Sequence, residues 1–274
     1  MGMRVLVTGG SGFIGRAVGR ELVRRGHQVA PFDLPNDVRD AGRVSAAVSH
    51  CDAVVHLAGV LGTAELFDTP RLPVEVNVLG TLNVLEACRD HGAGYVGITM
   101  PQVFPSLYTA SKVHATLIAS AYHREYGVPV SHVRAFNAFG AGQKHGPTHP
   151  RKIVPAFAAD AWNARPIVIW GDGEQTVDLI HVDQLGRMLV DALDHGDDVT
   201  FDGGTGQAFT VNEVAQMVLD ITCSAAGVEH RPMRRGEVPT FIVAKGEGWE
   251  RLGWRPSFDR ADLIDTVVDY RSHA

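Results

Sequence analysis

Short apolar runs alternate with longer amphipathic stretches through the first half of the chain. Five runs have the length and β-branched content of buried strands: residues 5–7, 29–32, 53–57, 95–99 and 130–133. Three longer stretches between them have helical spacing: residues 12–25, 74–91 and 108–126. Each of the three is followed by a glycine, the residue that most often ends a helix. Strands that alternate with helices of this length predict a parallel sheet covered on both faces.

The second half of the chain has a less regular pattern. Residues 140–151 combine glycine, proline, histidine and basic side chains, which indicates a functional loop rather than a linker. Three further elements are expected after it: strands at 167–170 and 199–201 and a helix at 211–221. We therefore predict two parts: a large sheet domain of residues 1–134 plus 178–200, and a smaller lobe of residues 135–177 plus 201–274. The smaller lobe is expected to close over the carboxyl edge of the sheet.

Composition narrows the class of protein. With 45% hydrophobic and 20% charged residues, the 274-residue chain has the balance of an ordinary globular protein. A net charge of -6 without a basic run argues against a nucleic-acid partner. No apolar run reaches the length of a membrane span, and no signal-peptide core precedes the first strand. We therefore expect a cytoplasmic protein without a membrane partner.

Cysteine and histidine spacing argues against a metal site. Cys51, Cys88 and Cys223 are far apart and form no CxxC pair, which predicts free thiols rather than disulfides or a zinc site. The densest histidine patch, residues 144–149, has no zinc-ligand spacing either. His56 lies at the end of an apolar run, where we expect a packed, hydrogen-bonded histidine.

A glycine-rich turn follows the first predicted strand. Gly9, Gly12 and Gly15 give the pattern GxxGxxG, and Gly10 with the last two also satisfies GxGxxG. Such glycines allow a tight turn and bring bare backbone and a helix N-terminus against a pyrophosphate. Asp33, at the end of the second predicted strand, is placed to bind ribose hydroxyls, and its carboxylate would repel a 2′-phosphate. The pattern predicts an NAD site; a turn without a ligand and a solvated aspartate are the alternatives.

Tyr108 and Lys112 are four residues apart at the start of the predicted helix 108–126, so they lie on one helix face. A lysine ammonium and an oxidised nicotinamide nearby would lower the tyrosine pKa from about 10. The pair is therefore a candidate general base that works near neutral pH.

These motifs resemble the extended short-chain dehydrogenase/reductases, specifically the NAD-dependent nucleotide-sugar epimerase/dehydratase family. Matching segments in the family's order cover nearly the whole chain: residues 52–59, 77–87, 134–137, 166–173, 175–178, 181–183 and 252–256. The resemblance implies an α/β fold, a Rossmann doubly wound parallel sheet with a smaller C-terminal substrate-binding lobe. It also implies an NAD-dependent enzyme that epimerises or dehydrates a nucleotide sugar by transient hydride transfer to NAD.

The resemblance further implies residue roles. Tyr108 would act as acid/base, with Lys112 on the nicotinamide ribose and Thr99 as a third catalytic residue. The implied cofactor-binding residues are Gly9, Gly12, Phe13, Ile14, Gly15, Asp33, Asp37, Val38, Leu57, Ala58, Gly59, Asn77, Tyr108 and Lys112. The implied substrate-binding residues are Asn137, Arg234, Arg235 and Lys144. Family members commonly form homodimers through helices that correspond to 74–91 and 108–126, so we expect a homodimer.

The chain departs from the family's pattern at several positions. Met100 stands where the family usually has a serine or threonine, and Thr99, one residue earlier, is the candidate substitute. Val177 replaces the arginine of a phosphate clamp and lacks its bidentate donors. The segment 33–37 is shortened, which removes a usual helix and strand, and the short stretch 104–106 predicts a more open site.

These departures keep two other functions open. The first is an NAD(H)-dependent dehydrogenase/reductase of a smaller, non-nucleotide alcohol or ketone, which Met100 and Val177 favour. The second is a non-catalytic NAD-sensing protein, against which the intact pair of Tyr108 and Lys112 argues, because a sensor needs no tuned phenol.

Overall fold

The central element is a six-stranded parallel sheet. The computed structural model describes residues 2–101, 103–145 and 151–273. The strand order is β2-β1-β3-β4-β5-β9, and every neighbouring pair is parallel. The bounds are β1 (Arg4–Thr8), β2 (Gln28–Phe32), β3 (Ala53–His56), β4 (Gly94–Thr99), β5 (Val130–Ala135) and β9 (Asp197–Gly203). The five strands predicted in the first half of the chain are confirmed.

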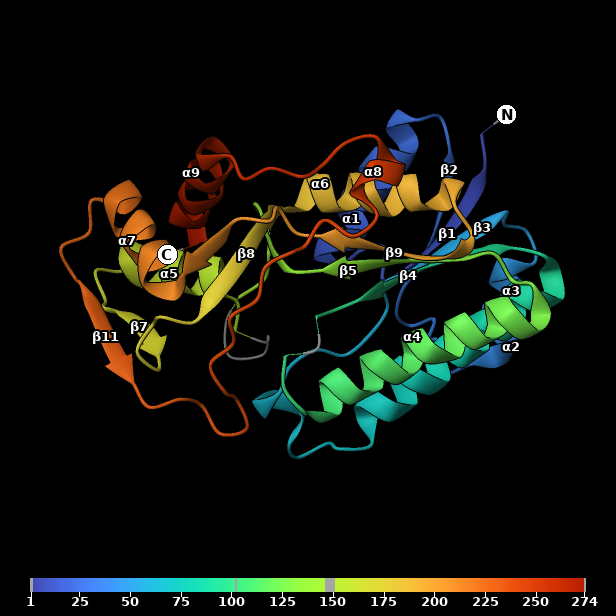
Figure 1. The fold of residues 1–274 in the computed structure, drawn as a ribbon, viewed down its shortest axis with the longest axis horizontal. Helices are drawn as coiled ribbons and strands as arrows, with labels where there is room; N and C mark the ends of the chain where they lie inside the picture. The colour runs from blue at the N-terminus through green and yellow to red at the C-terminus, as the bar shows by residue number, and fades with distance from the viewer. Residues whose placement is uncertain (1, 102, 146–150, 274) are drawn as a thin grey trace.

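Helices cover both faces of this sheet (Figure 1). One face carries α1 (Phe13–Arg24) and α6 (Val182–Asp191), and the other carries α2 (Ala41–Val48), α3 (Gly80–His91) and α4 (Leu107–Tyr126). Apolar side chains alternate between the two faces: Val5 and Val7 pack in the core under α1 and α6, and Leu6 packs in the core under α2 and α3. The predicted α/β class with a doubly wound parallel sheet is confirmed.

Two helices differ from the sequence prediction. The expected helix 74–91 begins as a π-helical turn, η2 (Val74–Leu79), and continues as α3. Helix α2 was missed; its N-cap Asp40 accepts a hydrogen bond from the Arg43 backbone N–H at 3.0 Å. Its apolar face is only two buried residues, Val44 and Val48, too short a pattern to indicate a helix from sequence. The glycines that end α1, α3 and α4 have φ values of +79°, +71° and +71°, as the sequence predicted.

The smaller lobe lies at one end of the main sheet (Figure 1). It contains a three-stranded sheet, β10-β8-β6, and a two-stranded sheet, β11-β7. The strands are β6 (Asn137–Phe139), β7 (Ile167–Trp170), β8 (Thr176–His181), β10 (Ala208–Thr210) and β11 (Val228–Arg231). The helices are α5 (Ile153–Trp162), α7 (Val211–Thr222) and α9 (Arg260–Asp269). Phe157, Leu179, Val214 and Leu263 are buried in its core.

Some segments after β9 return to the main sheet. In α8 (Trp249–Leu252) both terminal residues pack against the core that contains Phe201 of β9. The three expected domain boundaries fall inside strands: 134/135 inside β5, 177/178 inside β8 and 200/201 inside β9. The name smaller lobe is used from here on for the group of elements given above, which includes the whole of β8, and the two-part division stays a prediction. Short 3-10 turns lie at Ala64–Leu66, Ala192–Asp194 and Tyr270–His273. None of the helices in the described part of the chain combines the length and apolar character that a membrane crossing requires.

Candidate functional site

A cavity of about 680 Å³ lies where the carboxyl ends of the main-sheet strands meet the smaller lobe. In doubly wound sheets this edge is the usual place for a ligand. Fourteen of the residues expected at the site line this cavity: Gly9, Gly12, Phe13, Ile14, Gly15, Asp33, Leu57, Ala58, Gly59, Thr99, Tyr108, Lys112, Asn137 and Lys144. The topology thus brings together residues that are more than a hundred positions apart in the sequence.

The glycine loop between β1 and α1 packs closely against its neighbours. Gly9 has a φ of +70°, and a Cβ there would lie 2.9 Å from the Ala58 backbone nitrogen. A Cβ on Gly15 would lie 2.2 Å from the Gly9 carbonyl oxygen. Helix α1 has no acidic side chain in its first turn, so its partial positive charge is open to an anion. The loop has the shape and charge that a pyrophosphate needs.

Asp33 is fixed beside this loop, just after β2. Its carboxylate accepts hydrogen bonds from the Ser11 backbone N–H at 3.0 Å and from the Ser11 hydroxyl at 2.8 Å. Of the described residues that line the cavity, Asp33 is the only carboxylate. The glycine loop, the open helix end and this carboxylate together fit NAD, and the carboxylate disfavours a 2′-phosphate.

Tyr108 and Lys112 lie on the first two turns of α4, whose N-cap Ser106 accepts a hydrogen bond from the Thr109 backbone N–H at 3.0 Å. Burial raises the pKa of Tyr108 to about 12 and lowers the pKa of Lys112 to about 8. The cause of this shift at Tyr108 is desolvation of the phenolate. The expectation that a lysine ammonium and an oxidised nicotinamide together lower the tyrosine pKa stays a prediction. A lower value needs a further positive charge in the cavity.

Thr99 is the last residue of β4 and is buried. Its hydroxyl oxygen lies 2.9 Å from the Thr116 hydroxyl oxygen. Met100 lines the cavity next to it. Thr99 is thus placed to offer the hydroxyl that Met100 lacks, and its catalytic role stays a prediction.

Three expected cofactor residues lie outside the cavity lining. Asp37 forms an ion pair with Arg39 at 2.6 Å, and this guanidinium lowers the pKa of the Asp37 carboxyl. Val38 is buried in the core, where a Cβ on Gly80 would lie 2.7 Å from its side chain. Asn77 is also buried, and its side chain contacts a lining residue, Val60, rather than the cavity itself.

Asn77 joins the turn after β3 to α4. Its side-chain oxygen accepts from the Val60 N–H at 2.9 Å, and its amide donates to the Val60 carbonyl at 3.1 Å and to the Ser111 hydroxyl at 3.0 Å. Under the same turn, His56 lies between the Thr8 and Thr81 hydroxyls at 2.8 and 3.1 Å. Burial lowers the pKa of His56 to about 3, so it is a neutral, packed histidine as expected.

The side of the cavity formed by the smaller lobe combines apolar and polar side chains. Val177 and Leu179 of β8 line it, together with Ile153 and Val154 of α5 and Ile242. Its polar side chains are two lysines, Lys144 and Lys152, and the uncharged Asn137, Gln143, Thr176 and Thr240. Burial lowers the pKa of Lys152, against the opposing effect of the Glu65 carboxylate. Sequence reasoning missed Lys152 because Arg151 precedes it directly, and no local pattern shows which of the two points inward.

Arg234 and Arg235, which were expected to bind substrate, are not part of this lining. Arg234 is paired with Glu237 and, at 3.3 Å, with Glu65. The Arg235 guanidinium lies over the Phe67 ring, 5.1 Å from its centroid. Their substrate-binding role stays a prediction. The histidine patch 144–149 lies mostly outside the described residues.

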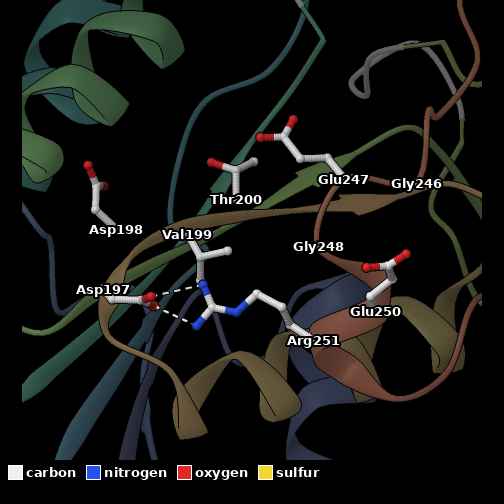
Figure 2. A pocket seen from close by; sticks show the side chains of 9 residues that line it. All are labelled: Asp197, Asp198, Val199, Thr200, Gly246, Glu247, Gly248, Glu250 and Arg251. Carbon is white, nitrogen blue, oxygen red and sulfur yellow. Dashed lines mark hydrogen bonds and ion pairs between the residues drawn. The ribbon is translucent and has the colours of Figure 1, made fainter.

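A second cavity, of about 370 Å³, lies beside β9 and the segment 246–251 (Figure 2). Asp197 and Arg251 form an ion pair across it at 2.8 Å, and the Asp198 side chain points away from this pair (Figure 2). The Arg251 guanidinium lowers the pKa of the Asp197 carboxyl. No expected site residue lines this cavity, and the described residues form no group of side chains suited to a metal ion.

Comparison with known proteins gives consistent matches over the whole chain. The sequence model of the NAD dependent epimerase/dehydratase family matches residues 5–100 and 99–203. The chain is 29% identical to dTDP-glucose 4,6-dehydratase from Streptomyces antibioticus, over 98% of this chain and 92% of that protein. The structure superposes on UDP-glucose 4-epimerase from Thermotoga maritima, solved with UDP-glucose, with a TM-score of 0.90 and 26% identity over 99% of each chain. The Thermus thermophilus UDP-glucose 4-epimerase complex with NAD gives a TM-score of 0.85 and 28% identity, over 99% of this chain and 100% of that one.

Proposed function

The chain belongs to the NAD-dependent epimerase/dehydratase family of enzymes, as its motifs predicted, and from that premise we propose that it converts a nucleotide sugar, with Tyr108 as the acid/base. The observation that carries this proposal is that Tyr108, Lys112 and Thr99 line the same cavity as the glycine loop and Asp33. Membership of an enzyme family removes the alternative of a non-catalytic NAD sensor.

Residues of the main-sheet side would hold the cofactor. The N–H groups at the start of α1 suit the pyrophosphate, and the Asp33 carboxylate suits the adenosine ribose hydroxyls. Lys112 is placed for the nicotinamide ribose. When bound, oxidised NAD supplies the reversible oxidation of a carbinol carbon and a positive charge that lowers the Tyr108 pKa.

Tyr108 and its neighbours handle the proton. With its pKa lowered toward neutrality, the Tyr108 phenolate oxygen accepts the hydroxyl proton of the substrate and later returns it. The Lys112 ammonium stabilises the phenolate, and Thr99 offers a hydroxyl to orient the substrate oxygen. The apolar lining from β8 and α5 excludes water from the opposite side.

The nucleotide part of the substrate would lie against the smaller lobe. Lys152, Lys144 and the Asn137 amide are the polar groups there that suit a diphosphate. The test is a panel of UDP- and dTDP-linked sugars, with products followed by NMR and the NADH absorbance recorded throughout. An epimerase or dehydratase regenerates its NAD, so the product accumulates without net NADH; no conversion of any of them would contradict the proposal.

Two residues of the lining support a second candidate function. Met100 and Val177 place apolar atoms where a polyhydroxylated, diphosphate-bearing ligand needs polar partners. An NAD(H)-dependent dehydrogenase/reductase of a smaller, uncharged alcohol or ketone would fit such a lining. It would consume NADH in a fixed ratio to product and would bind neither UDP nor dTDP in a calorimeter.

We also propose a cytoplasmic homodimer. Val74 and Leu79 of η2 are 45% and 49% exposed, and Leu117 of α4, which packs beside η2, is 61% exposed. Apolar side chains gathered on neighbouring helices suit a helix-to-helix interface. Light scattering on the purified protein tests the dimer, with Leu117→Glu as the disrupting variant, and cell fractionation tests the location.

A further inference from the structure

The three arginines of α1 and the arginine at its C-cap, Arg25, differ in what neutralises them. Three are ion-paired with carboxylates: Arg20 with Asp183, Arg24 with Glu21, and Arg25 with both Glu21 and Asp191. Arg16 forms no ion pair with any described residue, and it is the only one of the four that lines the large cavity. The helix therefore leaves one cation uncompensated, at the end that faces the cofactor site.

Two backbone carbonyls hold the Arg16 guanidinium in place. It donates to the Ser11 carbonyl at 2.9 Å and to the Gly142 carbonyl at 3.1 Å. Both acceptors are neutral, so these bonds do not offset the positive charge, and among the described residues they use two of its five N–H donors. Ser11 belongs to the glycine loop, and Gly142 belongs to the described part of the loop that follows β6. Arg16 therefore bridges two segments that both line the cavity.

The charges around the cavity favour an anion at this position. Asp33 is the only carboxylate among the described lining residues, whereas Arg16, Lys112, Lys144 and Lys152 are cationic. The open N-terminus of α1 adds partial positive charge beside Arg16. The backbone N–H groups of the loop are neutral donors. Arg16 would add a full positive charge, which these N–H groups do not carry.

We propose that Arg16 binds the pyrophosphate of NAD through its side chain and thereby joins the cofactor to the loop around Gly142. This inference rests on NAD as the cofactor and not on the identity of the sugar substrate. Gln143 and Lys144, next to Gly142, line the substrate side of the cavity. Arg16 is thus a binding residue for the cofactor and a positioning residue for the loop.

The test compares ligands that have a pyrophosphate with one that lacks it. NAD, ADP-ribose and adenosine are titrated by calorimetry into the wild-type protein and into Arg16→Gln. We expect Arg16→Gln to bind NAD and ADP-ribose about tenfold more weakly and adenosine equally well. The wild-type affinity for NAD should fall more steeply with salt than that of the variant, because a full charge contact is lost.

Two further variants keep the result interpretable. Arg20→Gln makes the same change one turn along α1, outside the cavity, and should bind NAD as the wild type does. Arg16→Lys retains the charge without the planar fork and should recover part of the lost affinity. Thermal unfolding of each variant checks that the fold is intact.

Three results would overturn the inference. Equal NAD binding by the wild type and Arg16→Gln would leave Arg16 as a structural link between two loops. An equal loss for adenosine and NAD would show an indirect effect on the whole site. With NADP titrated in parallel, a loss confined to NADP would place the guanidinium at a 2′-phosphate. Absence of NAD binding by the wild type would reject the cofactor itself, which distinguishes that failure from the failure of Arg16.

Discussion

The two sides of the large cavity are built differently. On the main-sheet side, the polar groups are the backbone of the glycine loop, a single carboxylate, Asp33, and the side chains of Ser11, Arg16, Thr99, Tyr108 and Lys112. On the smaller-lobe side, apolar and polar side chains are mixed, no described lining residue is a carboxylate, and Lys144 and Lys152 are the cations. This lining comes from β6, β8, α5 and the segments 142–144 and 240–242. The first side has the features of a fixed cofactor site, and the second has those of a site adapted to one substrate.

This difference separates cofactor recognition, which depends on backbone geometry, from substrate recognition, which depends on particular side chains. A pyrophosphate is recognised by backbone geometry, which the glycines impose whatever the surrounding side chains are. A sugar diphosphate is recognised by particular side chains, and here Val177 occupies a position where the family resemblance implies an arginine. In the proposed function, the first side holds NAD and the second side selects the substrate.

Replacement of Tyr108 should have the largest effect, because it removes the group that links the two sides. With a nucleotide sugar that the wild type converts, Tyr108→Phe should lower kcat by roughly a hundredfold or more, the usual size of a general acid–base contribution. The affinity for NAD should stay near the wild-type value, because the ring and the fold are kept. Steady-state kinetics and calorimetry measure the two quantities.

Lys112→Ala is the companion variant. It should lower both the affinity for NAD and kcat, because Lys112 is assigned to the nicotinamide ribose and to the phenolate. Turnover by Tyr108→Phe at the wild-type rate would remove the tyrosine from the mechanism.

The sequence could predict the main-sheet side because its determinants are local. Gly9, Gly12 and Gly15 lie within seven residues, and each is required by a close backbone approach. The effect of burial on this side could not be predicted. Burial raises the pKa of Tyr108 to about 12, which the spacing of Tyr108 and Lys112 in the sequence does not reveal. Asn77 likewise acts by fixing the turn at Val60, a contact that only the fold brings about.

The smaller-lobe side was predicted only in part, at Asn137 and Lys144, because most of its residues meet only in three dimensions. Arg234 was expected to bind an anion, but the carboxylates of Glu237 and Glu65 neutralise it, and Glu65 is 169 positions away in the chain. Lys152 lines the cavity instead. A basic residue in a sequence does not show which carboxylates the fold will place beside it.

Replacement of Lys152 should have the next largest effect, on the affinity for the substrate diphosphate. If it holds the substrate diphosphate, Lys152→Ala should weaken UDP or dTDP binding by about tenfold or more, the size of a charge-assisted hydrogen bond. Arg234→Ala should weaken binding less, because that guanidinium is already paired. A greater loss in Arg234→Ala would restore the sequence-based assignment.

The same lysine predicts a pH dependence. Burial lowers the pKa of Lys152, so its charge is lost at a lower pH than that of an exposed lysine. Diphosphate binding should therefore weaken as pH rises from neutral into the alkaline range. Lys152→Arg keeps its charge over this range, so its binding should change less with pH. Calorimetry at several pH values compares the two proteins.

Replacement of Asp33 tests cofactor recognition on the main-sheet side and should have a smaller effect on affinity. The wild type should bind NAD at least about tenfold more tightly than NADP, or ~1.4 kcal/mol, because a 2′-phosphate would lie against the carboxylate. Asp33→Ala should narrow this difference, although it also removes the hydrogen bonds to Ser11. Tryptophan fluorescence titration with both cofactors measures it, and equal wild-type affinities would reject the NAD preference.

Val177→Arg should have the smallest effect and tests whether the smaller-lobe side can be restored to the family pattern. Val177 lines the cavity from β8, so an arginine there would direct its guanidinium toward the expected diphosphate. UDP or dTDP binding should tighten by roughly threefold to tenfold, less than a full charge-assisted contact because the new side chain must be ordered and β8 must accommodate it. Val177→Gln, which is polar but shorter and without charge, is the control and should give no gain. If the wild type, Val177→Arg and Val177→Gln all fail to bind UDP and dTDP, the apolar residues of the lining exclude a diphosphate. A dehydrogenase of a small uncharged alcohol then becomes the better assignment.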